Sequence, residues 1–170
     1  QLNNFYIEGG QTALIDAIFQ SVKMAAEQTG VTGNYQHAVI VISDGEDRDS
    51  SNTEKQLLEL IKGSSVSVFF VGLINELSNE GGFTTKSPRA KSKAFIEKIT
   101  GESGGIAIFP KKIDELPQAA KQISSLMRSR YMMKFLPATK PNTDAKIEIR
   151  FAKDSKRKNL SIYSRPHLTR

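Results

Sequence analysis

Apolar residues recur along the chain with two alternating spacings as far as residue 130. From Thr12 to Gln28 they return every three or four positions, which predicts an amphipathic helix. Ala38 to Ile42 is instead a short, continuous run rich in β-branched residues, typical of a strand that is covered on both faces. The same two patterns predict further helices over 52–62, 91–99 and 114–130, and further strands over 66–71 and 105–109.

Several local signals set the expected ends of these elements. Gly63 should stop the helix over 52–62, and Asp114 should cap the helix over 114–130, with Pro117 in its first turn. Because helices alternate with buried strands, the sequence predicts an α/β fold, a Rossmann-like and mostly parallel sheet flanked by helices.

The pattern changes after residue 130. Three strand-like runs follow, over 131–136, 145–151 and 160–163, and the alternation of apolar and polar residues in the last two predicts a C-terminal antiparallel β element with one wet face. Residues 128–170 also hold half of the 24 basic residues and only 3 of the 18 acidic ones. This asymmetry predicts an α/β core over 1–127 and a basic β appendage over 128–170.

Composition removes several classes of site. The 170 residues include no cysteine and two histidines, which excludes disulfides, thiolate metal sites and a cysteine nucleophile, and disfavours a histidine zinc site. No apolar run approaches the roughly 18 residues that a membrane-spanning helix needs. The chain also lacks the glycine-rich loops that bind nucleotide phosphates.

A cluster of carboxylates follows the strand at 38–42, where parallel sheets carry their functional groups. Asp44 stands at the strand end; alone it has a structural interpretation, capping a helix or holding a turn. For Glu46, Asp47 and Asp49, two interpretations stay open: a solvated loop that caps the helix after residue 52, or groups around a metal ligand. A phosphoryl hydrolase would need a second Asp where Glu46 stands, so an enzyme is not favoured.

Two stretches, GGQTALIDAI (9–18) and VIVISDGED (39–47), together resemble the von Willebrand factor A domain family, in particular bacterial members with an appended β element. The resemblance implies a non-enzymatic adhesion or protein-binding module, found outside the cytoplasm, with a divalent cation at the carboxyl edge of the sheet. It assigns Thr12 and Asp44 as metal ligands. Mg²⁺ fits such oxygen ligands, with Mn²⁺ or Ca²⁺ as alternatives, and a carboxylate of a protein partner would complete the shell.

The chain departs from this family at one motif. It contains no Asp-x-Ser-x-Ser run, and DRDSS (47–51) has the wrong spacing and position. The family's first metal-binding segment is therefore missing, and the strand at 37–43 would lack the neighbour with which it normally pairs. We therefore expect weak Mg²⁺ binding at most, and self-association through an uncovered sheet edge. The alternative function is a metal-independent assembly domain that uses this edge and the β tail.

The basic tail raises a separate question about polyanions. Lys156, Arg157 and Lys158 stand together in one loop, as in proteins that bind phosphates. However, no aromatic residues stand among them to stack on bases, and the other tail cations are spaced like solvent-facing positions of a helix and strands. The sequence therefore predicts no specific nucleic-acid partner, and a tail that docks on the acidic core.

Overall fold

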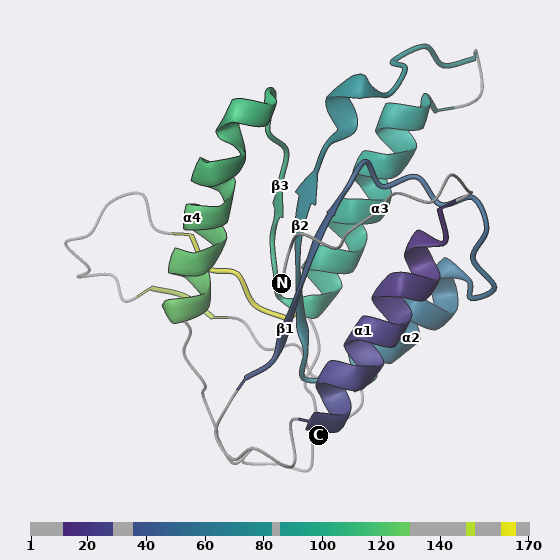
Figure 1. Cartoon of the computed structure of the whole chain (residues 1–170). Coiled ribbons are helices and arrows are strands. Elements are labelled where there is room, and N and C mark those ends of the chain that lie inside the picture. Colours follow the sequence, from purple (N-terminus) through teal and green to yellow (C-terminus); the bar gives the residue numbers. More distant parts are fainter. Residues whose placement is uncertain (1–11, 29–35, 83–85, 130–148, 152–160, 166–170) are drawn as a thin grey trace, which may run out of the picture.

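The computed structural model describes residues 12–28, 36–82, 86–129, 149–151 and 161–165 (Figure 1). Helices and strands alternate along it. The helices are α1 (Leu14–Gln28), α2 (Glu54–Gly63), α3 (Pro88–Ser103) and α4 (Leu116–Arg128), with short 3-10 turns η2 (Ile74–Glu76) and η3 (Ile113–Glu115). The strands are β1 (Ala38–Ser43), β2 (Ser67–Gly72) and β3 (Ala107–Ile108). The predicted succession of elements is confirmed, although α3 is longer and β3 shorter than the sequence suggested.

The described strands form one parallel sheet in the order β1-β2-β3. All of β1 is in register with β2, from Ala38 opposite Ser67 to Ser43 opposite Gly72. The short β3 continues the sheet, with Ala107 opposite Phe70. The chain therefore has the predicted α/β fold with a parallel sheet.

Helices cover the two faces of this sheet unequally. In Figure 1, α1, α2 and α3 lie on one side of the strands and α4 lies on the other. Val68 and Phe70 of β2 point into the core with the three helices. Phe69 and Val71 of the same strand pack with α4. Every residue of β2 is buried, as expected for a central strand of a parallel sheet.

The strand β1 differs from the prediction that both of its faces would be covered. Val39 and Val41 pack partly against the three-helix side. On the α4 side, Ile40 is 51% exposed and Ile42 is 62% exposed. Among the described residues, β1 is an edge strand and α4 packs mainly on β2 and its neighbours. The apolar run was therefore interpreted correctly as a strand but wrongly as one covered on both faces.

Local caps explain where the helices begin and end. Thr53 and Gln56 form a reciprocal capping box at the start of α2. Ser87 caps α3, which ends at Gly104 in the left-handed conformation with φ 70°. The helix α2 ends at Gly63, where the sequence predicted its stop. The predicted cap of the last helix was wrong, because Asp114 lies within η3 and Glu115 is the residue that precedes α4.

Most of the predicted C-terminal β element lies outside the described residues. The expected strand at 131–136 falls there entirely; the described parts of the other two, 149–151 and 161–163, contain no strand. Arg165 nevertheless contacts the core, because its guanidinium donates hydrogen bonds to the carbonyls of Ser64 and Val66. Among the described helices, none combines the length and apolarity that crossing a membrane requires.

Candidate functional site

The loop after β1 begins at Asp44, at the carboxyl end of the strand. A carboxylate oxygen of Asp44 accepts a hydrogen bond from the Glu46 backbone N–H at 3.0 Å, which closes a tight turn. Gly45 has a φ of 82°, and a Cβ at this position would come within 2.7 Å of Ile96 Cδ1 in α3. The loop thus requires glycine for both its backbone conformation and its close approach to α3.

The same loop holds the beginning of α1. The Asp47 carboxylate accepts a hydrogen bond from the Ile15 N–H at 2.9 Å, and the Ser50 hydroxyl accepts one from the Asp16 N–H at 3.0 Å. Asp47 and Ser50 therefore satisfy free donors in the first turn of α1, although they are distant in sequence. The prediction that this loop caps the following helix was wrong for Asp47, since Thr53 caps α2.

Asp16 of α1 also binds the loop that follows β1. Its carboxylate accepts hydrogen bonds from the backbone N–H groups of Ser51 and Asn52, each at 2.8 Å, and from the Asn52 side chain at 2.7 Å. The bond from the Ser51 N–H, then the two from Asn52, lowers the pKa of Asp16 below 3.8, because they favour the charged form. Asp16 is therefore a structural carboxylate that joins α1 to the loop.

Thr12 and Asp44, the two predicted metal ligands, belong to one cluster of loops. The backbone carbonyl of Thr12 accepts a hydrogen bond from the Arg48 N–H at 2.9 Å, within the loop that Asp44 begins. Thr12 itself is exposed. This hydrogen bond joins the segment of Thr12 to the loop that follows β1.

The described residues offer too few oxygen ligands to complete the coordination shell of a cation. A Mg²⁺ ion requires near-octahedral oxygen coordination, which a threonine hydroxyl and one carboxylate do not supply. Within residues 12–28, 36–82 and 86–129, no group of three acidic or histidine side chains could hold a metal ion. Asp16 and Asp47 are engaged by the hydrogen bonds described above. The described residues therefore do not by themselves fit a tightly bound metal.

An open cleft of about 730 Å³ lies beside this loop cluster. Its walls carry both signs of charge, and several of these charges pair: Glu54 with Lys98 at 2.6 Å, and Glu46 with Arg48 at 2.5 Å. Because the paired side chains are substantially exposed, each pair contributes little to stability. The cleft offers a mixed polar surface rather than a single-sign binding site.

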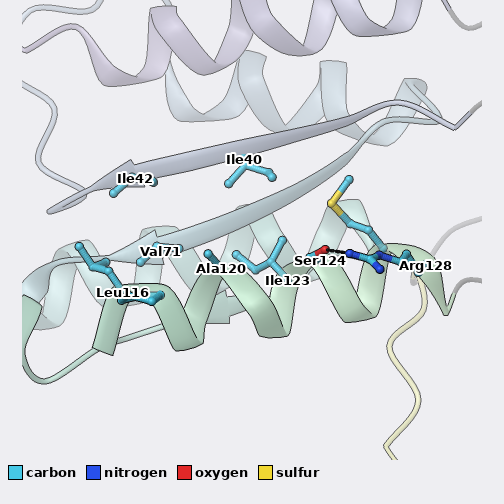
Figure 2. Close-up of a pocket in the computed structure, with 10 residues that line it drawn as sticks. Ile40, Ile42, Val71, Leu116, Ala120, Ile123, Ser124 and Arg128 are labelled. Atoms are coloured by element: carbon cyan, nitrogen blue, oxygen red, sulfur yellow. Dashed lines mark hydrogen bonds between the residues drawn. The ribbon is translucent and has the colours of Figure 1, made fainter. Parts of the chain in front are cut away.

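A second hollow differs in chemistry. It is a groove of about 600 Å³ between β1 and α4, which we call the β1–α4 groove (Figure 2). Its lining is apolar apart from Ser124 and Arg128, which are joined by a 2.8 Å hydrogen bond at one end. The residues that line it are Ile40, Ile42, Val71, Leu116, Pro117, Ala120, Ile123, Ser124, Met127 and Arg128.

The groove brings together three of the exposed large apolar residues of the described core, Ile40, Ile42 and Met127. Ile40 and Ile42 lie on β1 opposite the apolar side of α4. Figure 2 shows Ile123 of α4 on the side of the helix that faces the sheet. Met127 at the end of α4 is 37% exposed. Sequence reasoning predicted an uncovered edge at this strand but missed the groove. The available signal was that Ile40 and Ile42 share one face of β1, opposite the apolar stripe of α4.

Comparisons with known proteins add little to this description. No protein-family profile matches the chain, and no curated protein is similar to it. One similar crystal structure is described as an uncharacterized membrane spanning protein from Vibrio fischeri; it shares 22% sequence identity, with a TM-score of 0.43. The match covers 59% of this chain and 52% of that protein, so the chain spans about half of its length.

Proposed function

We propose that this chain is a non-enzymatic protein-binding module of von Willebrand factor A type, which binds its partner through the outer edge of β1 and the β1–α4 groove. The observation that carries the proposal is the exposure of Ile40 and Ile42, at 51% and 62%, on a strand of a parallel sheet. Strands of parallel sheets are normally buried on both faces. This proposal is the alternative function given in the sequence analysis, an assembly domain that needs no metal ion.

The groove has the size and chemistry of a peptide-binding surface. Its volume of about 600 Å³ lies in the range of pockets that hold ligands, and its lining is almost wholly apolar. The edge of β1 adds backbone donors and acceptors beside it. An extended apolar segment would fit both features: its backbone would bind the edge of β1, and its side chains would cover Ile40 and Ile42.

This proposal can be tested by selecting peptides that bind the chain from a displayed random library. We expect the selected peptides to be extended and apolar, and to bind Ile42→Lys at least about 10-fold more weakly than the wild type, because a charge then occupies the strand edge. Ile113→Lys is the matched control, since Ile113 is 78% exposed but lies outside the groove. Peptides that bind wild type and Ile42→Lys equally would contradict the proposal.

A second candidate function is metal-dependent binding of a partner's carboxylate at the carboxyl edge. It is supported by the hydrogen bond from the Arg48 N–H to the Thr12 carbonyl, which joins the segment of Thr12 to the loop that begins at Asp44. A cation there would supply a positive charge for the partner's acidic group. The chain's own residues would supply the Thr12 hydroxyl and the Asp44 carboxylate, and the remaining ligands would have to come from water or from elsewhere.

Calorimetric titration distinguishes the two candidates. For the chain alone we expect Mg²⁺ to bind with a dissociation constant no tighter than about 1 mM, because one carboxylate and one hydroxyl hold so hydrated an ion poorly. Tight binding of Mg²⁺ or Mn²⁺ that disappears in Asp44→Ala and persists in Asp49→Ala would favour the metal-dependent function. Peptide binding abolished by EDTA would point the same way.

The basic tail is proposed to serve contacts with the chain's own core rather than nucleic acid. Arg165 supports this, because it binds two backbone carbonyls of the core. The cations at 153–158 lie outside the described residues. We expect binding to DNA or RNA to be weak and to fade at physiological salt. Submicromolar, sequence-selective binding at that salt, lost when Lys156, Arg157 and Lys158 are replaced by alanine, would overturn this assignment.

A further inference from the structure

We propose that the core carries a binding site for a guanidinium group at the amino end of the sheet, and that Arg165 of the C-terminal segment occupies it. Arg165 is then the anchor that holds residues 161–165 on the core. The inference rests on the proposed contact of the basic tail with the core, and adds the site, the anchoring residue and the chemistry of the contact.

Two nitrogens of the Arg165 guanidinium bind two different carbonyls. Nη1 donates a hydrogen bond to the carbonyl oxygen of Ser64, and Nη2 donates one to the carbonyl oxygen of Val66. Both carbonyls belong to the short segment between α2 and β2, where Ser64 and Val66 are themselves buried. Buried carbonyls require a donor, and a planar guanidinium presents several donors in a fixed fork. This pair of acceptors therefore suits a guanidinium better than the ammonium of lysine.

The guanidinium site also lies where two helices present negative partial charge. The helix α2 ends at Gly63, next to Ser64, and α3 ends at Ser103, next to Gly104. The last turn of α3 contains no basic residue of its own. Because the carbonyl groups at a helix C-terminus favour a nearby cation, Arg165 supplies to α3 the charge that its own sequence lacks.

Gly104 forms one wall of the guanidinium site. Its φ of 70° is left-handed, and a Cβ at this position would lie 2.8 Å from Cγ of Arg165 and 3.2 Å from its backbone nitrogen. The side chain of Arg165 therefore packs directly on the residue that ends α3, in space that glycine leaves open. This contact does not involve the two carbonyls, so it is an independent sign that the core accommodates Arg165.

Buried serines of the core hold this corner in place. The Ser103 hydroxyl accepts a hydrogen bond from the Val68 N–H at 2.9 Å, and the Ser67 hydroxyl donates one to the Ser103 carbonyl at 3.1 Å. Ser67 and Ser103 are both fully buried. These bonds join the end of α3 to the start of β2 without any residue of the tail. The core itself therefore positions the wall and the carbonyls, and such preorganisation favours binding.

Arg165 is the residue of its segment that contacts the core most closely. Residues 161–164 are exposed, with Ile162 at 38% and Tyr163 at 57%, whereas Arg165 is half-buried. The segment, yellow in Figure 1, lies away from the loop that follows β1. Docking of the segment therefore depends mainly on one side chain and does not involve that loop.

Limited proteolysis with chymotrypsin tests whether Arg165 anchors the segment. Cleavage after Tyr163 requires residues on both sides of the bond to enter the protease, so docking of Arg165 should slow it. We expect Arg165→Ala to release residues 164–170 at least about 10-fold faster than wild type, because two charge-assisted hydrogen bonds are lost. Arg165→Lys should be intermediate, since an ammonium cannot form the fork. Arg157→Ala, which removes the same charge elsewhere in the tail, should behave as wild type.

Chemical rescue tests the chemistry of the guanidinium site separately from the tail. In Arg165→Ala the site has lost its occupant, so free ethylguanidinium should bind there and narrow the difference in melting temperature between the variant and wild type. Ethylammonium at equal concentration carries the same charge but no planar fork, and should leave the difference unchanged. Circular dichroism follows the unfolding, and shows at the starting temperature whether each chain is folded.

The wall contact predicts that Gly104 and Arg165 are coupled. Gly104→Ala strains the backbone in any background, but the new Cβ meets the long side chain of Arg165 only when that residue is present. The midpoint of urea denaturation should therefore fall less when Gly104→Ala is introduced into Arg165→Ala than when it is introduced into wild type. Equal falls in the two backgrounds would overturn the wall contact.

The outcomes separate this inference from the proposed tail contact. Equal cleavage of wild type and Arg165→Ala overturns the anchor, and equal rescue by ethylammonium and ethylguanidinium overturns the guanidinium site. If alanine at Lys156, Arg157 and Lys158 speeds the release of residues 164–170 while Arg165→Ala does not, the tail docks through other cations, and the inference alone fails. If neither variant changes the rate of release, the proposed contact between tail and core fails as well.

Discussion

The loop after β1 and the groove beside β1 adjoin the same strand, but the loop residues already have hydrogen-bond partners, whereas the groove residues on β1 are exposed. In the loop, Asp16, Asp47 and Ser50 are all engaged in hydrogen bonds that join the loop to α1. In the groove, Ile40 and Ile42 remain exposed, and among the described residues no strand pairs with the outer edge of β1. Residue types associated with binding chemistry can thus serve the fold, while plain aliphatic residues form the open surface.

This difference has a physical cause. Backbone N–H groups require hydrogen-bond partners in the folded chain, and the carboxylates of Asp16 and Asp47 accept from such groups in the loop and at the start of α1. Exposed apolar surface can be removed from water only by another apolar surface. A patch on an edge strand therefore indicates an interaction site more directly than acidic residues in a loop do.

Ile123→Ala should have the largest effect on stability. It tests whether the α4 side of the groove is part of the folded core, in contrast to the exposed residues on β1. Ile123 lines the groove but is only 2% exposed, because its side chain packs between α4 and the sheet. We expect the free energy of unfolding to fall by about 2–5 kcal/mol. Urea denaturation measures it, and Ile113→Ala, at an exposed position, should change it by less than about 0.5 kcal/mol.

Gly45→Ala should show that the loop is built into the fold. The added Cβ would meet Ile96 at 2.7 Å, and the φ of 82° strains any other L-residue. A loss of about 2–4 kcal/mol in the free energy of unfolding is expected from strain and overpacking together. Gly63→Ala is the matched control, since a Cβ there has no atom within 4 Å and should stabilise α2 slightly. Equal stabilities for the two variants would refute this explanation.

Asp16→Asn should reveal the structural role of the carboxylate through pH. Hydrogen bonds lower the pKa of Asp16 below 3.8 in the folded chain, so its charged form stabilises the fold above that value. The stabilisation should disappear as the pH falls through the folded-state pKa. The variant should therefore unfold at lower urea concentration than wild type at pH 7, and the difference should shrink as the pH falls through the lowered pKa of Asp16. Asp49→Asn controls for the loss of one loop charge.

Ile42→Thr should have the smallest effect on the fold. Its side chain is 62% exposed and threonine retains the β-branched shape that suits a strand. At concentrations where both chains are monomeric, the free energy of unfolding should change by less than about 0.5 kcal/mol. A loss as large as that of Ile123→Ala would mean that Ile42 is covered within a single chain, and would remove the basis for the binding surface.

Much of the fold could be predicted from sequence because each element has a local cause. The spacing of apolar residues identified the helices at 14–28 and 54–63, and β-branched runs identified β1 and β2. Segment ends were less predictable. Asp114 has the residue type of a helix cap, yet it lies within η3, which leads directly into α4, so that Glu115 precedes the helix. Residue type alone therefore locates a helix end only to within a few residues.

The candidate site was predictable only in part. The pattern of apolar residues placed Asp44 at the end of a strand, and that Thr12 and Asp44 bind a metal ion stays a prediction from the resemblance. Only the tertiary structure decided that Asp47 and Asp16 bind across the loop and α1, because these hydrogen bonds join residues more than thirty positions apart.

The sequence by itself determined the parallel α/β arrangement, since the periodicities of helices and buried strands are properties of neighbouring residues. Whether an apolar strand face is covered depends instead on where a distant helix packs. Val71 and Ile42 are both β-branched residues in apolar runs, yet α4 buries the first to 3% exposure and leaves the second 62% exposed. That difference, which creates the groove, was decided by tertiary packing alone, because burial is a property of all surrounding elements together.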